Sequence, residues 1–295
     1  MKRSDCGLFG AASRSESSLI DASTISRLLQ QGSISRIIHD DATISNDEFF
    51  VDPPPREDCP ICMLIMPISP GSCGVQTSYQ SCCGKMLCGG CVVAAYNKIE
   101  KGEMKELCAF CRVPPALSNE EEIARLKKRM KFKDAVAFYE LGMAYTSGKW
   151  GLPVDMNKTL ELWNRAADLG SISAHFSRVV HYQSSDMRKA VHYCKIAAIK
   201  GHERARYYLG CGERDNGNMD LAIKHWMIAA KSGDDESLKE VGKGYKIGLV
   251  TKDEYTKALR AYQETQSGMK SKERVKAAEH VKSRRESGRR ALHSH

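Results

Sequence analysis

The chain has 295 residues, of which 42% are hydrophobic, and carries a formal net charge of +9 at pH 7. This length suits about two domains, and no apolar run approaches the ~20 residues of a membrane-spanning helix. Nine Lys or Arg against three Glu in residues 270–295 account for +6 of the charge, so we expect no specific nucleic-acid surface elsewhere. Glycine-rich phosphate loops and the motifs H-E-x-x-H and G-x-S-x-G are absent from the sequence, which argues against those enzyme classes.

The N-terminal region, residues 1–55, is rich in serine and ends in Asp52-Pro53-Pro54-Pro55, which predicts disorder. Apolar residues between Leu19 and Ile38 fit a short amphipathic helix, either a docking element or a weak organelle transit signal. Acidic residues among the first 21 positions argue against transit, and the start lacks the apolar core of a secretory signal. We therefore expect an intracellular protein, cytoplasmic or nuclear.

Eight of the twelve cysteines form four couples in residues 56–115, and no histidine lies among them. A C-x-x-C couple turns the backbone tightly enough for two thiolates to reach one metal ion, and two couples close a tetrahedral zinc site. Four couples therefore predict two structural Zn²⁺ ions bound by thiolates alone. The predicted ligands are Cys59, Cys62, Cys82, Cys83, Cys88, Cys91, Cys108 and Cys111.

Two other uses of these thiols are less consistent with the pattern. Disulfides need an oxidising compartment, for which the sequence shows no signal. A single redox-active C-x-x-C would not explain the other three couples.

The order and gaps of the couples resemble the RING finger, the zinc module of many ubiquitin ligases. This resemblance implies a cross-brace, in which couples one and three (Cys59, Cys62, Cys88, Cys91) share one ion and couples two and four share the other. Lys85 stands where the family usually has a histidine, and lysine is a poor zinc ligand. Cys82 is then the expected replacement, which makes an all-cysteine variant, and Cys73 is a further candidate.

The resemblance also implies a docking surface for a ubiquitin-conjugating enzyme and no chemistry at the metals. Ile61 lies between the first two ligands, where the family offers an apolar contact, and Arg112 follows the last ligand, where some active members contact ubiquitin. Residues 92–99 have the helical periodicity of the family's groove-lining helix. Ala109 replaces a frequent proline, and no tryptophan lies between Cys91 and Cys108. A non-enzymatic zinc-stabilised adaptor is the alternative.

Residues 116–133 are expected to form a connecting helix, since acids open the segment and bases close it, as the helix dipole favours. Beyond it, an Ala-Ala-x-x-Gly motif recurs at Ala166, Ala197 and Ala229, with an aromatic residue, Trp163, Tyr193 or Trp226, three or four residues before each copy. A fixed period of 31 or 32 residues indicates stacked supersecondary units. Ala-Ala permits close helix approach, and glycine ends the helix in a left-handed cap.

This pattern resembles the Sel-1-like repeat, a relative of the tetratricopeptide repeat. The overall prediction is a mainly α protein, in which the small cross-braced finger is followed by an α-solenoid of helical hairpins. Both the N-terminal region and the basic tail, residues 269–295, are expected to be disordered. The resemblance implies that the solenoid binds a protein or peptide on its concave side. The four predicted repeats span about 134–170, 171–201, 202–233 and 234–268.

Overall fold

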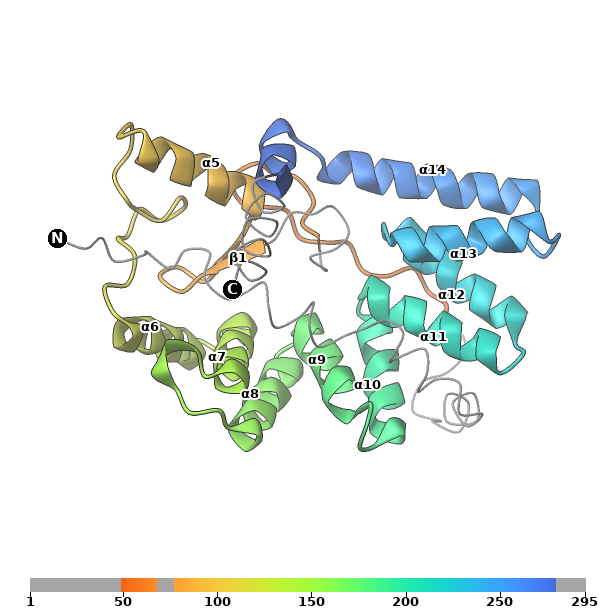
Figure 1. The fold of residues 1–295 in the computed structure, drawn as a ribbon, viewed down its shortest axis with the longest axis horizontal. Helices are drawn as coiled ribbons and strands as arrows, with labels where there is room; N and C mark the ends of the chain where they lie inside the picture. The colour runs from red at the N-terminus through yellow and green to blue at the C-terminus, as the bar shows by residue number, and fades with distance from the viewer. Residues whose placement is uncertain (1–48, 68–76, 280–295) are drawn as a thin grey trace, which may run out of the picture.

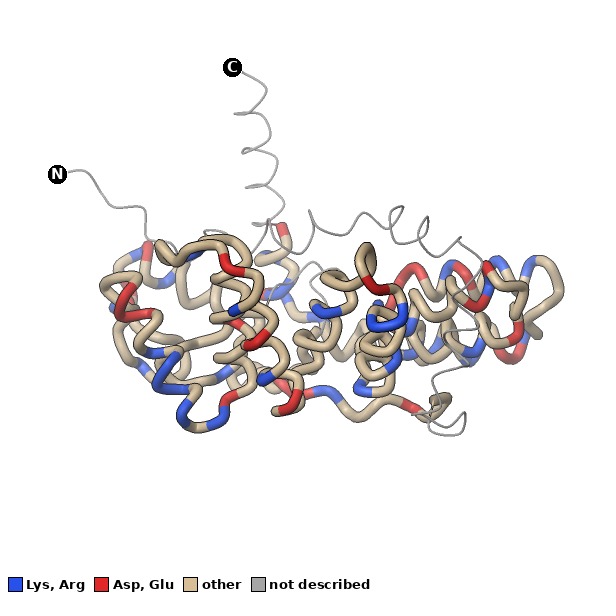
Figure 2. The backbone as a smooth tube through the Cα atoms, turned by 90° about the horizontal axis from the view of Figure 1, so that it is seen from below, with Lys and Arg blue, Asp and Glu red and all other residues tan. Residues whose placement is uncertain are grey.

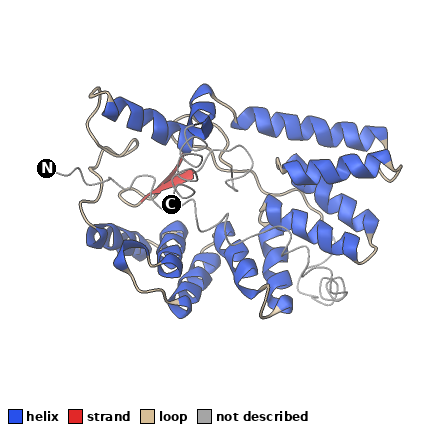
Figure 3. Cartoon of the chain, in the orientation of Figure 1, coloured by secondary structure: helices blue, strands red, loops and turns tan. Residues whose placement is uncertain are grey.

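The computed structural model describes residues 49–67 and 77–279, and this part of the chain is mostly helical (Figures 1 and 3). Within it, no helix combines the length and the apolar character that crossing a membrane would require. The amphipathic stretch between Leu19 and Ile38, Cys73 and the end of the basic tail lie outside the described residues. The elements are β1 (Thr77–Gln80), β2 (Lys85–Cys88), α5 (Gly89–Glu100), α6 (Asn119–Lys131), α7 (Ala135–Ser147), η1 (Lys149–Gly151), α8 (Met156–Asp168), α9 (Ile172–Tyr182), α10 (Met187–Ile199), α11 (Glu203–Asp215), α12 (Met219–Lys231), α13 (Asp235–Lys246) and α14 (Lys252–Met269).

Eight of these helices form consecutive packed pairs, α7–α8, α9–α10, α11–α12 and α13–α14, as a helical-hairpin solenoid requires. The pairs also contact their neighbours, so the stack is continuous from α6 to α14. The stack curves, and α14 runs back toward the cysteine-containing module (Figure 1). Acidic and basic residues are interspersed along the stack (Figure 2). The predicted mainly α architecture with a hairpin solenoid is therefore present.

The recurring Ala-Ala-x-x-Gly motif ends three of the hairpins in the same way. Gly170, Gly201 and Gly233 have φ values of 94°, 98° and 91°, the left-handed region that glycine adopts without strain. The residue after each glycine donates its N–H to the carbonyl of the first alanine, at 2.9, 2.9 and 3.1 Å. This hydrogen bond closes the helix end and turns the chain into the next hairpin.

In the first and third repeats a Leu-Gly pair, Leu141-Gly142 and Leu209-Gly210, places its glycine against the aromatic residue of the same repeat. A Cβ at Gly142 would lie 2.7 Å from the indole of Trp163, and one at Gly210 would lie 2.5 Å from that of Trp226. The second repeat lacks this glycine; there the guanidinium of Arg178 lies 3.6 Å from the ring centroid of Tyr193. In each of these three repeats the aromatic residue of the second helix packs on the first helix. Its partner is a glycine in two repeats and an arginine, stacked as a cation on the ring, in the other.

We expect Gly210→Ala to destabilise the protein by about 1–3 kcal/mol, because the added methyl overlaps the buried ring of Trp226. Gly242→Ala is the matched control, since its nearest side-chain atom would be 3.6 Å away, an ordinary contact. At that position alanine should stabilise the helix by up to about 1 kcal/mol. Urea unfolding measures both. Equal effects of the two substitutions would contradict the close contact.

The cysteine-containing module is built on a small hairpin and one helix. Strands β1 and β2 pair antiparallel, with Thr77 opposite Cys88 and Gln80 opposite Lys85. The turn between them carries Cys82 and Cys83, while Cys88 ends β2 and immediately precedes α5. Two cysteine couples are thereby brought to opposite ends of one short strand.

The module is fastened to the solenoid on two sides. Near α6, Tyr79 Oη donates to Asp134 Oδ2 at 2.7 Å, and Ser81 Oγ donates to Glu122 Oε2 at 2.9 Å. On the other side, helical residues 272–279 pack on α5, where a Cβ at Gly90 would lie 2.8 Å from Arg274. The solenoid and the module therefore form one connected body.

Two stretches differ from the expectation of unstructured ends. Phe49, in the region predicted to be disordered, is 4% exposed, and Arg274, in the predicted basic tail, is 1% exposed. Both are buried by partners that lie far away in sequence: Phe49 contacts His225, and Arg274 contacts Leu64 and Ile65. Local composition carries no information about such contacts.

Candidate metal centre

The first cysteine group brings together couples one and three, Cys59 and Cys62 with Cys88 and Cys91. Their four sulfur atoms all lie within 4.8 Å of one another. Sγ–Sγ distances of 3.9 Å (Cys59–Cys91) and 3.7 Å (Cys62–Cys88) link the two couples. Cys59 and Cys88 are fully buried. These are the four residues that the cross-brace pattern assigns to the first ion.

The second group brings together couples two and four, Cys82 and Cys83 with Cys108 and Cys111. Cys111 Sγ lies 3.4 Å from Cys82 Sγ, and Cys108 Sγ lies 3.7 Å from Gln80 Oε1. Both vicinal cysteines belong to this group. The fourth position is thus filled by cysteine without a contribution from Lys85.

The loops of the first and fourth cysteine couples, Cys59–Cys62 and Cys108–Cys111, have the same backbone geometry. Met63 N–H donates to Cys59 O at 2.8 Å, and Arg112 N–H donates to Cys108 O at 3.0 Å. The residue after the second cysteine is left-handed in both, with φ of 55° at Met63 and 61° at Arg112. Such positions are uncommon for residues other than glycine. In this conformation each loop turns its two sulfur atoms toward one point.

The donor set fits a tetrahedral metal ion. Zn–S bonds of about 2.3 Å in a tetrahedron place the sulfur atoms about 3.8 Å apart, close to the 3.4–3.9 Å found here. The distances are far longer than the ~2.05 Å of a disulfide bond, and all eight cysteines are free thiols. Each group can therefore hold one ion that prefers soft sulfur ligands.

The protonation behaviour of the thiols reflects their crowding. Burial would raise the pKa of Cys59, but hydrogen bonds from the backbone N–H groups of Cys88, Cys62 and Ile61 outweigh it and lower the pKa to about 7. Burial and then the neighbouring Cys88 raise the pKa of Cys91. One thiol of the first group therefore deprotonates readily, whereas deprotonation of several requires a cation that compensates their charge.

The predicted docking residues lie on the outer side of the cysteine loops. Ile61 is 41% exposed, and Arg112 is exposed, with Nη1 3.3 Å from Met104 Sδ. Phe110, between the last two ligands, is similarly exposed. The ammonium of Lys85 lies 6.0 Å from the centre of the Phe110 ring.

Arg274 contacts the first cysteine group but was missed by sequence reasoning. Its Nη2 lies 3.5 Å from Cys62 Sγ and donates to Leu64 O at 3.0 Å, while Nη1 donates to Ile65 O at 2.6 Å. The residue sits among many basic neighbours in the C-terminal region, and nothing in the local sequence distinguishes it. Its role depends on a contact that spans 212 positions.

No family model and no curated protein matches the chain. Among solved structures it is similar to a Sel1 repeat protein from Oxalobacter formigenes, with 19% identity, a TM-score of 0.42, and 59% of this chain and 71% of that chain covered. It is also similar to c5321, a protective antigen of uropathogenic Escherichia coli strains that displays an SLR fold, with 19% identity and a TM-score of 0.37. That match covers 65% of this chain and 44% of the antigen. The repeat architecture described above rests on this chain's own helices.

Proposed function

We propose that this chain is a zinc-binding RING-type ubiquitin ligase. Residues 56–115 form the finger and hold two structural Zn²⁺ ions, residues 116–133 connect it, and the Sel-1-like repeats of residues 134–268 bind substrate or partner proteins. The observation that carries the proposal is the interleaving of the cysteine couples, one with three and two with four. This interleaving is what the resemblance to the RING finger implies.

In this proposal the finger performs no bond chemistry itself. It holds a ubiquitin-conjugating enzyme whose cysteine carries ubiquitin as a thioester. A substrate lysine attacks the thioester carbonyl, an amide bond forms, the C–S bond breaks, and the thiol of the conjugating enzyme leaves with a proton. Ile61 and Phe110 supply apolar contact to the enzyme, and Arg112 contacts the carried ubiquitin. Their exposure on the two cysteine loops supports these roles.

The test is discharge of ubiquitin from a loaded conjugating enzyme to lysine, followed across a panel of such enzymes. We expect Ile61→Ala and Arg112→Ala each to reduce the discharge rate at least ~10-fold, a loss of about 1.4 kcal/mol in transition-state stabilisation. Zinc content and unfolding midpoints should be unchanged, because both side chains are exposed. Val154→Ala, at an exposed apolar position in the solenoid, is the control. Full activity of both finger variants would refute the proposed surface.

A non-enzymatic adaptor is the second candidate, and the contacts between finger and solenoid favour it. The finger is fixed to α6, to Asp134 and to residues 272–279 through partly buried hydrogen bonds, as a rigid scaffold requires. Lys85 at the usual histidine position and the missing tryptophan also favour this reading. Bound zinc with no discharge by any conjugating enzyme would select the adaptor.

A further inference from the structure

Residues Phe49–Arg56, here called the tethered segment, cross the solenoid between α11 and α14 (Figure 1), and residues 52–56 belong to no helix or strand. Side chains of α10, α11 and α12, together with Ser232, form the segment-binding face. The segment is held at both ends and along its length, although it lies about 150–180 positions away from these partners in sequence.

The aromatic end of the tethered segment is bound by rings and cations. The rings of Phe49 and Phe50 each lie 4.9 Å from the imidazole of His225, centre to centre. The ammonium of Lys195 lies 5.5 Å from the centre of the Phe49 ring, and that of Lys224 lies 5.7 Å from the Phe50 ring. Aromatic rings attract cations at these distances.

A buried guanidinium recognises the backbone of the tethered segment. Arg206 is 2% exposed and donates from Nη1 to Phe49 O and from Nη2 to Ala198 O at 3.1 Å. Burial lowers the pKa of Arg206 to about 10. A buried cation is costly without hydrogen-bond acceptors, and one acceptor here comes from the segment itself.

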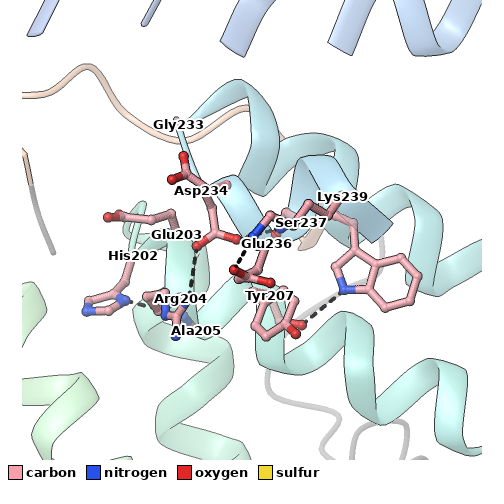
Figure 4. A network of polar contacts seen from close by, with 12 residues as sticks. His202, Glu203, Arg204, Ala205, Tyr207, Gly233, Asp234, Glu236, Ser237 and Lys239 are labelled. Carbon is pink, nitrogen blue, oxygen red and sulfur yellow. Dashed lines mark hydrogen bonds and ion pairs between the residues drawn. The ribbon is translucent and has the colours of Figure 1, made fainter. Parts of the chain in front are cut away.

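The opposite end of the tethered segment is bound by a buried acid and a backbone carbonyl. Arg56 forms an ion pair of 3.3 Å with Glu203, whose side chain is fully buried, and donates to Ser232 O. Glu203 lies beside Asp234, which pairs with Arg204 at 3.5 Å and accepts the N–H of Ser237 at 2.8 Å (Figure 4). Burial raises the pKa of Asp234, and Glu203 raises it further. This acidic end therefore favours a basic ligand residue.

The middle of the tethered segment needs little more than an extended chain. Pro53 and Pro54 pass Gly201, where a Cβ would lie 3.3 Å from Pro53. At the exposed rim, Asp52 pairs with Lys231 at 2.6 Å. Three consecutive prolines hold the chain extended with little entropy to lose on binding.

We propose that the segment-binding face is a peptide-recognition site, that the tethered segment fills it as a pseudo-ligand, and that partners carrying an extended aromatic–acidic–proline–arginine stretch compete with it. This inference deepens the partner-binding role proposed above for the repeats and rests on that role. The face and the segment are complementary in charge: cations face the aromatic rings and Asp52, and Glu203 faces Arg56. A tether of this kind supplies a local concentration on the order of mM, so the face is closed to weak ligands until it is released.

The test uses the full chain and a fluorescent peptide of sequence Phe49–Glu57, with a scrambled peptide as control, followed by anisotropy. The release variant Phe49→Ala/Arg56→Gln should bind the peptide at least ~100-fold more tightly than wild type, because the competitor in cis is weakened. Asp52→Lys places like charges at the exposed rim without altering a buried side chain, and should raise the affinity about two- to fivefold.

The register of the peptide is tested by charge reversal. In the release variant, Lys231→Glu should weaken binding of the peptide, and a peptide with Lys in place of Asp52 should restore it. Equal affinity of wild type, the release variant and Asp52→Lys for the peptide would overturn the proposal. So would a release variant that keeps its helical content but does not bind the peptide. If wild type were a dimer that dissociated on addition of the peptide, the tethered segment would occupy the face of a second copy, and binding within one chain would be refuted. No ubiquitin reagent is involved, so failure of ligase activity would leave this result unaffected.

Discussion

Cys88→Ser and Cys82→Ser are each expected to lower the bound zinc from two ions per chain to one. Each substitution removes one thiolate from a different group of four, and Cys88 is fully buried at the centre of the first. Structural zinc contributes roughly 10–16 kcal/mol to the folding of small fingers. Loss of one ion should therefore unfold its half of the module while the solenoid stays helical. Elemental analysis gives the zinc content, and circular dichroism gives the helicity.

The matched control is Cys194→Ser, because Cys194 is a buried cysteine of α10 that belongs to neither group. Its sulfur already donates to Ala205 O at 3.3 Å, a bond that a hydroxyl can keep. This variant should retain two zinc ions. One ion in wild type, or two ions in Cys82→Ser, would show that the second group does not act as a four-thiolate site.

The parts of the structure that sequence could predict are those specified by short-range geometry. A C-x-x-C loop needs only five residues to aim two sulfur atoms, and the Ala-Ala-x-x-Gly motif needs only six to end a helix and start a turn. Gly201 and Gly233 could be anticipated because glycine accepts a left-handed backbone without strain. The four cysteine couples could be recognised for the same reason, although their pairing came only from the resemblance to the RING finger.

The parts that sequence could not predict depend on distant partners. Phe49 follows a polar stretch and Arg274 lies in a strongly charged one, and both are buried by segments more than 150 positions away. A single buried contact of this kind is enough to order a segment that its local composition would predict to be unstructured. The left-handed backbone at Met63 and Arg112 was also unforeseen, since neither residue type favours it.

Arg274→Met is expected to destabilise the protein by about 3–5 kcal/mol, because it leaves three buried or partly buried carbonyl oxygens without their donor, at about 1–3 kcal/mol each. The guanidinium of Arg274 bonds three carbonyl oxygens, those of Leu64, Ile65 and Met269. Methionine fills much of the volume but donates no hydrogen bond. Lys276→Met, at an exposed position in the same helical stretch, is the control and should change stability by less than ~0.5 kcal/mol. Urea unfolding compares the two.

The same substitution should weaken the first zinc site specifically, since Arg274 Nη2 lies 3.5 Å from Cys62 Sγ. Four thiolates around Zn²⁺ carry a net charge of −2, which a buried cation offsets, and loss of such an outer partner typically costs 10–100-fold in metal affinity. Competition with a chelator should therefore release one ion at ~10–100-fold lower chelator activity in Arg274→Met, while the second ion stays bound. Arg274→Lys keeps the charge but loses the planar fork, so it should restore metal affinity more fully than stability. If both ions were released as in wild type, Arg274 would serve only to fasten residues 272–279 to the finger.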